Sequence, residues 1–148
     1  VARDAAAMIN HARADTAADA NRVGTTGYCM SGPFALWIAA EFPEVVKSVA
    51  SIHGVKLAVD ADDSPHRRVG DISGEVLVMA AEHDDFVDRA HYDRLVAAFE
   101  AAGTSAHCEW VDEAHHGFVF PQRAKFHKAA AERHWELLYG LFDRTLKN

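Results

Sequence analysis

The sequence predicts an α/β fold with a doubly wound, mainly parallel sheet and helices on both faces of that sheet. Four short apolar runs have the composition of buried strands, and helical patterns with a period near 3.6 residues lie between them. Because strand and helix alternate along the chain, right-handed βαβ crossovers and a parallel sheet are the expected connections. The expected strands cover residues 22–28, 45–53, 75–81 and 107–111.

The helices are predicted from alanine content and from apolar spacing. An alanine-rich helix over residues 3–20 starts the chain, so no strand precedes the first βα unit. Pro33 opens a second helical run after the first strand. Two more helices are indicated by the spacing of Tyr92, Leu95, Val96 and Phe99, and of Phe126, Ala130, Leu137, Leu138, Leu141 and Phe142. We therefore expect one domain over residues 1–148 that lacks the N-terminal strands of a complete sheet.

The connection over residues 55–73 is long for a compact domain. Several aspartates, a proline and a glycine interrupt it, and it shows no sustained strand or helix period. Segments of this length are usually lids, binding loops, short helices or disordered stretches. We expect this segment to form part of the pocket wall.

Composition restricts the class of protein. With 148 residues, 49% of them hydrophobic, the chain can bury one core. Its net charge of -7 repels nucleic acid and anionic membranes, and no apolar stretch approaches the ~20 residues of a spanning helix. The only two cysteines, Cys29 and Cys108, do not suggest a disulfide scaffold, so we expect a soluble cytoplasmic protein without a cofactor. The oligomeric state stays open, and a homo-oligomer is one outcome.

Residues that directly follow the expected strands are the candidates for a functional site. Ligands of doubly wound sheets bind at the carboxyl ends of the strands, where side chains from different strands meet. The residues in these positions are Cys29, His53, Gly54, Asp84, Asp85, His115 and His116.

Residues 27–32 have the pattern of a nucleophile elbow. They read Gly-Tyr-Cys-Met-Ser-Gly between a strand and a helix, and an elbow needs small neighbours because the two backbones approach closely. Cys29 holds the central position, beside a helix N-terminus that favours a thiolate. The same cysteine could instead be a small buried apolar residue or an oxidation-sensitive thiol.

An acid and a base follow in the chain order that α/β-hydrolases use. Asp84 comes after the third strand and His116 after the fourth, which completes the order nucleophile, acid, histidine. Asp85 is the reserve candidate for the acid. A redox role for Cys29 alone would not explain these two residues.

Three motifs in register resemble the dienelactone hydrolase family of the α/β-hydrolase superfamily. Residues 27–32 are similar to its elbow G-x-C-x-G-G, residues 82–87 to its acid loop E-x-D-x-x-V, and residues 116–118 to its H-G-F. The resemblance spans nearly all of this chain but only the C-terminal portion of the family's fold. It implies a hydrolase that cleaves a small carboxylic ester or lactone through a cysteine acyl-thioester.

The resemblance also implies roles for individual residues. Cys29, Asp84 and His116 would form the catalytic triad, and the Met30 N–H would donate to the oxyanion. We place Phe118 of the H-G-F motif at the oxyanion and substrate-binding wall. His53 either borders this wall or hydrogen-bonds a neighbouring loop. Ser31 replaces the second elbow glycine, so we expect a slightly wider elbow.

Two other interpretations of the sequence stay open. His107, Cys108, His115 and His116 could be considered as ligands of a metal ion. Strand alternation places His107 and Cys108 on opposite faces of the sheet, so no metal site is expected. Alternatively, the chain is a truncated hydrolase-like domain that binds a ligand or partner without turnover. Four further histidines fall at polar positions of expected helices, where we expect them to face solvent: His11, His91, His127 and His134.

Overall fold

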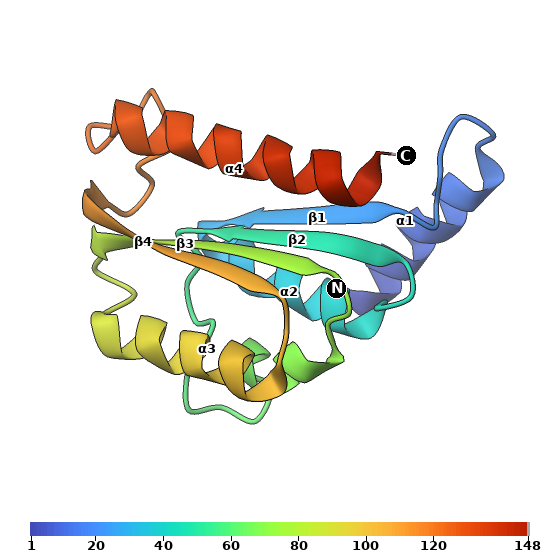
Figure 1. The fold of residues 1–148 in the computed structure, drawn as a ribbon, viewed down its shortest axis with the longest axis horizontal. Helices are drawn as coiled ribbons and strands as arrows, with labels where there is room; N and C mark the ends of the chain where they lie inside the picture. Colours follow the sequence, from blue (N-terminus) through green and yellow to red (C-terminus); the bar gives the residue numbers. More distant parts are fainter. Residues whose placement is uncertain (148) are drawn as a thin grey trace.

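The computed structural model describes residues 1–147 and contains a four-stranded sheet (Figure 1). Every neighbouring pair of strands is parallel, which confirms the predicted parallel α/β architecture. The strand order β1-β2-β3-β4 follows the chain, so all four carboxyl ends lie at one edge of the sheet. The strands are β1 (Val23–Tyr28), β2 (Val46–Ile52), β3 (Glu75–His83) and β4 (Ala106–His115).

Helices cover both faces of the sheet, as predicted. In Figure 1, α2 and α3 lie on one face and α4 lies alone on the other. Two 3₁₀ helices, η1 and η2, lie in the connections, and η1 leads directly into α2. The bounds are α1 (Ala2–Ala14), η1 (Cys29–Ser31), α2 (Gly32–Glu41), η2 (Pro65–Asp71), α3 (Arg89–Ala102) and α4 (Lys128–Leu146).

The alternation of side chains along the central strands produces two apolar layers. Val78 points into the layer shared with α2 and α3, whereas its neighbour Met79 points into the layer under α4. Both side chains are buried, which is why β3 has a continuous apolar run instead of an alternating pattern. The two layers hold the strands rigid, so their carboxyl ends are fixed relative to one another.

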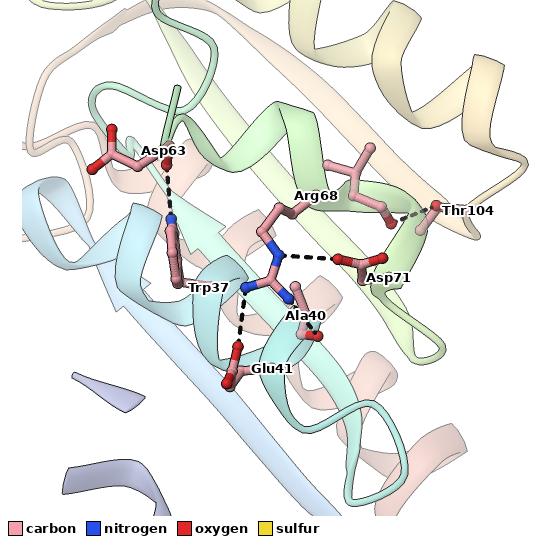
Figure 2. A network of polar contacts seen from close by, with 8 residues as sticks. Trp37, Ala40, Glu41, Asp63, Arg68, Asp71 and Thr104 are labelled. Carbon is pink, nitrogen blue, oxygen red and sulfur yellow. Dashed lines mark hydrogen bonds and ion pairs between the residues drawn. The ribbon is translucent and has the colours of Figure 1, made fainter. Parts of the chain in front are cut away.

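The long segment over residues 55–73 is fastened to the helices. It contains η2, so the short-helix alternative is the one that the structure shows. Arg68 donates to the Glu41 carboxylate at 3.0 Å, and the Trp37 indole N–H donates to the Asp63 carbonyl at 3.0 Å. Figure 2 shows both contacts. Both partners anchor the segment to α2, on the face away from α4.

The first helix is shorter than predicted. It ends at Ala14, although the alanine-rich pattern continues to residue 20. The Asp15 side chain accepts the N–H of Ala17 at 2.9 Å, so a local turn competes with the next turn of helix.

The last strand is longer than the predicted residues 107–111. It continues to His115, which pairs with His83 of β3 after a shift in register. Glu113 has a positive φ of 58°, and its N–H donates to the Glu82 carboxylate at 2.7 Å. Because this irregular end of β4 contains polar residues, the apolar pattern of the sequence does not reveal it. The end of the strand nevertheless positions His116.

Candidate active site

The nucleophile candidate lies in a tight turn at the end of β1. Cys29 has a φ of 53°, a left-handed conformation that is uncommon for a residue with a side chain. A Cβ on Gly27 would lie 2.2 Å from the Ser31 carbonyl oxygen, and one on Gly32 would lie 2.7 Å from the Gly54 Cα. Both glycines are therefore required by close backbone approach, as the elbow pattern predicts.

Ser31 closes this turn with hydrogen bonds. Its Oγ accepts the Tyr28 N–H at 2.7 Å and donates to the Tyr28 carbonyl at 2.8 Å. The expectation that Ser31 only crowds the elbow misses this contribution, because the hydroxyl ties the end of β1 to the start of α2.

The acid candidate is held by two hydrogen bonds. The Asp84 side chain is 1% exposed and directly follows β3. Its Oδ1 accepts the Phe86 N–H at 2.9 Å, and its Oδ2 accepts from His116 Nδ1 at 2.8 Å. Asp85, the reserve candidate, is exposed. The structure therefore places Asp84, and not Asp85, against the histidine.

His116 joins the acid candidate to the thiol. An ionised Asp84 can only accept, so Nδ1 of His116 carries the hydrogen of their bond. The other ring nitrogen, Nε2, lies 3.0 Å from Cys29 Sγ and is free to accept the thiol proton. Three side chains from three different strand ends thus form one continuous line of hydrogen bonds.

His53, at the end of β2, lies directly against the base candidate. Its ring is 1% exposed, its centroid lies 4.9 Å from that of His116, and neither ring nitrogen has a hydrogen-bond partner in residues 1–147. Burial, followed by the nearby His116, lowers the pKa of His53 to about 4. A neutral imidazole therefore packs behind His116 at neutral pH. The ring neither reaches the surface nor bonds a loop, in contrast to both sequence-based expectations.

The other two predicted wall residues lie in different environments. Phe118 is fully buried, with its ring 5.6 Å from that of His53, so it supports the site from the core and does not face a ligand. Met30 is 71% exposed and immediately follows Cys29. Its position at the start of η1 suits the predicted N–H donor.

The prediction that His134 faces solvent is wrong. Its side chain is fully buried, and its Nε2 shares a hydrogen bond of 2.9 Å with the hydroxyl of Tyr28, the residue before Cys29. The sequence does contain a signal for this burial, because His134 lies one helical turn from Ala130 and from Leu138, which are both buried.

No alternative centre in residues 1–147 has comparable chemistry. No group of three or more His, Cys, Asp or Glu side chains there is arranged to hold a metal ion. A groove of about 510 Å³ lies between α4 and the amino ends of β3 and β4, but its charges pair with one another, as in Arg144 with Glu75 at 2.9 Å. No helix in the described part of the chain is long and apolar enough to cross a bilayer.

The parallel sheet with a nucleophile elbow at its carboxyl edge is the architecture of the α/β-hydrolase class. Within that class the chain belongs to the dienelactone hydrolase family, whose model matches residues 1–146. It is 29% identical over 140 residues to a carboxymethylenebutenolidase from Rhodococcus opacus, covering 90% of this chain and 54% of that protein. The chain spans about half the length of the curated relatives it matches.

Solved structures agree with the family on the fold. A candidate dienelactone hydrolase from Klebsiella pneumoniae subsp. pneumoniae superposes with a TM-score of 0.84 at 24% identity, over 94% of this chain and 58% of that one. A dienelactone hydrolase-like promiscuous phosphotriesterase from metagenomic libraries gives a TM-score of 0.79 at 22% identity, over 97% and 60%. At these identities the likeness concerns the fold alone.

Proposed function

We propose that the chain hydrolyses small carboxylic esters or lactones with Cys29 as nucleophile, His116 as base and Asp84 as the orienting acid. The observation that carries the proposal is the pair of contacts made by His116, 3.0 Å to the thiol and 2.8 Å to the carboxylate. This is the geometry in which a base can take a nucleophile's proton while its tautomer is held fixed. Both cysteines are free thiols, and we place the activity in the cytoplasm, where thiols stay reduced.

The proposed reaction has two stages. His116 takes the thiol proton as Cys29 Sγ bonds to the carbonyl carbon, and the resulting tetrahedral adduct breaks its carbon–oxygen bond to give an acyl-thioester. His116 returns the proton to the leaving oxygen. It then takes a proton from water, whose hydroxide attacks the thioester, so that the acid is released and the thiol is restored.

The Met30 N–H is the donor that we assign to the oxyanion of both adducts. It belongs to the residue after the nucleophile, where α/β-hydrolases place one such donor. Removing a single donor from such a site typically slows turnover by about 10²–10³-fold.

A thiol nucleophile favours substrates with good leaving groups. The tetrahedral adduct can expel either the thiolate or the leaving group of the substrate. When that leaving group is poor, as an amide nitrogen is, the adduct loses the thiolate and returns to starting material. Activated esters and enol lactones avoid this competition. The name of the Rhodococcus relative denotes action on a butenolide, which is an unsaturated lactone, and this supports the same substrate class.

Hydrolysis of p-nitrophenyl acetate tests the proposal. We expect Cys29→Ala and His116→Ala each to lower kcat/KM by about 10³-fold or more, because each removes a group that acts in the chemical step. Cys108→Ala is the matched control and should retain the parent rate. Equal rates in all four proteins would contradict the proposal and would favour a domain that binds without turnover.

A further inference from the structure

An exposed aromatic ring stands against the base candidate. Phe86 is 65% exposed, yet its ring centroid lies only 4.9 Å from that of His116, with an interplanar angle of 67°. This edge-to-face contact places an apolar surface beside the residue that bonds the thiol. Large apolar side chains that remain exposed beside a reactive group are candidates for ligand contacts.

The position of Phe86 is fixed on both sides along the chain. Its own N–H is held by Asp84 Oδ1 at 2.9 Å, and the next residue, Val87, is 4% exposed. Asp88 then caps α3 by accepting the His91 N–H at 2.8 Å. The ring is therefore presented by a short, anchored loop, and the carboxylate that orients His116 also fixes the backbone of Phe86.

A second exposed apolar side chain lies next to the nucleophile. Met30 is 71% exposed and immediately follows Cys29, and Phe34, one helical turn later, is 45% exposed. Met30 adjoins the thiol and Phe86 adjoins the base, so we call these two residues the apolar rim. A substrate carbonyl that reaches Cys29 Sγ comes close to the Phe86 ring, because that ring contacts His116, whose Nε2 lies 3.0 Å from the sulfur.

We propose that Phe86 is a specificity-determining residue whose ring binds a planar apolar group, aromatic or unsaturated, attached near the carbonyl that Cys29 attacks. The inference rests on the proposed function for the class of reaction and adds the kind of substrate. Two aromatic rings in contact gain more than their buried area alone, whereas a small acetyl or amide group offers Phe86 almost no surface. The apolar rim should therefore discriminate between reagents that differ only by a phenyl group.

Alkylation of Cys29 tests this without requiring turnover. Iodoacetamide and N-phenyl iodoacetamide share one reacting group, and glutathione gives their intrinsic rate ratio. We expect the phenyl reagent to modify Cys29 about threefold to tenfold faster than that ratio predicts, as an aromatic contact allows. Phe86→Ala should abolish the excess, and Phe86→Tyr should keep it. Met8→Ala replaces a methionine that is 73% exposed on α1 and should change nothing.

The outcomes separate this inference from the proposed function. Mass spectrometry would report the rates at Cys29 and Cys108 in the same sample. If Cys29 reacts no faster than Cys108 with either reagent, the activated nucleophile of the proposed function is contradicted. If the parent shows no excess for the phenyl reagent, or if Phe86→Ala retains that excess, the role of Phe86 is overturned whatever the esterase assay gives. Thermal unfolding would verify that Phe86→Ala is folded.

Discussion

The carboxyl edge of the sheet differs in construction from the apolar layer that the sheet shares with α2 and α3. The edge contains irregular backbone and a buried polar ring, whereas the layer contains regular apolar packing. At the edge, Cys29 and His53 have positive φ angles, and the His53 ring is buried without a hydrogen-bond partner among the described residues. Within the layer, regular strands and helices bury aliphatic side chains such as Leu36 and Val49. Strained and unpaired groups persist only where the surrounding structure holds them in place, and at His53 that support includes the packed rings of Phe118 and Phe120.

The two cysteines show the same contrast in a single residue type. Cys29 lies at the edge, with its sulfur 3.0 Å from His116 Nε2. Cys108 lies on β4 against the layer, where burial, followed by the charge of Glu100, raises its pKa to about 11. At neutral pH the Cys108 thiol therefore stays protonated and is a poor nucleophile. The surroundings of each cysteine, and not the residue type, decide its chemistry.

Among the variants that compare the edge with the layer, the largest effect should come from Asp84, one of two adjacent aspartates at the edge. Asp84→Asn replaces an acceptor with an amide that can donate to His116 Nδ1, which would leave the hydrogen on Nε2 and block proton transfer from the thiol. We expect kcat/KM to fall by about 10²–10⁴-fold, with the fold retained. Asp85→Asn, the matched control, should retain the parent rate. Similar losses of kcat/KM in both variants would show that activity depends on the net charge at the edge, and not on the hydrogen bonds that join Asp84, His116 and Cys29.

The buried His53 at the edge should make the stability of the fold depend on pH. The pKa of His53 is about 4 in the folded state and about 6.5 in an unfolded chain, so the unfolded state binds more protons between these values. Stability from a neutral His53 is complete above pH 6.5 and is lost as the pH falls towards 4. We expect this residue to account for about 2–3 kcal/mol of the stability lost between pH 7 and pH 4.5.

Urea unfolding of His53→Asn at both pH values would measure that contribution. Asparagine tolerates a positive φ and does not titrate, so the stability of this variant should depend less on pH than that of the parent. His11→Asn, which changes an exposed histidine on α1, should match the parent. Equal pH dependence in parent and His53→Asn would contradict the buried, neutral His53 and weaken the contrast between edge and layer.

The candidate triad could be predicted because each member lies within a contiguous motif at a strand end. Cys29 is recognisable from its immediate neighbours, and strand order then indicates which aspartate and histidine lie near it. The contact between Phe86 and His116 joins two loops whose relative placement depends on β3 and β4 packing together, so no local pattern encodes it. The burial of His134 likewise depends on where α4 meets Tyr28.

The smallest predicted effect is at Ser31, which connects the edge to the first turn of α2. Its hydroxyl makes two hydrogen bonds to Tyr28, but the residue is exposed, so water can replace part of what is lost. We expect Ser31→Ala and Ser31→Gly each to destabilise the fold by about 1 kcal/mol and to lower kcat/KM by less than about tenfold. A faster Ser31→Gly enzyme would mean that the serine Cβ strains the elbow more than its hydroxyl stabilises it. An equal loss in the two variants would assign the effect to the hydroxyl alone, since only alanine keeps the Cβ.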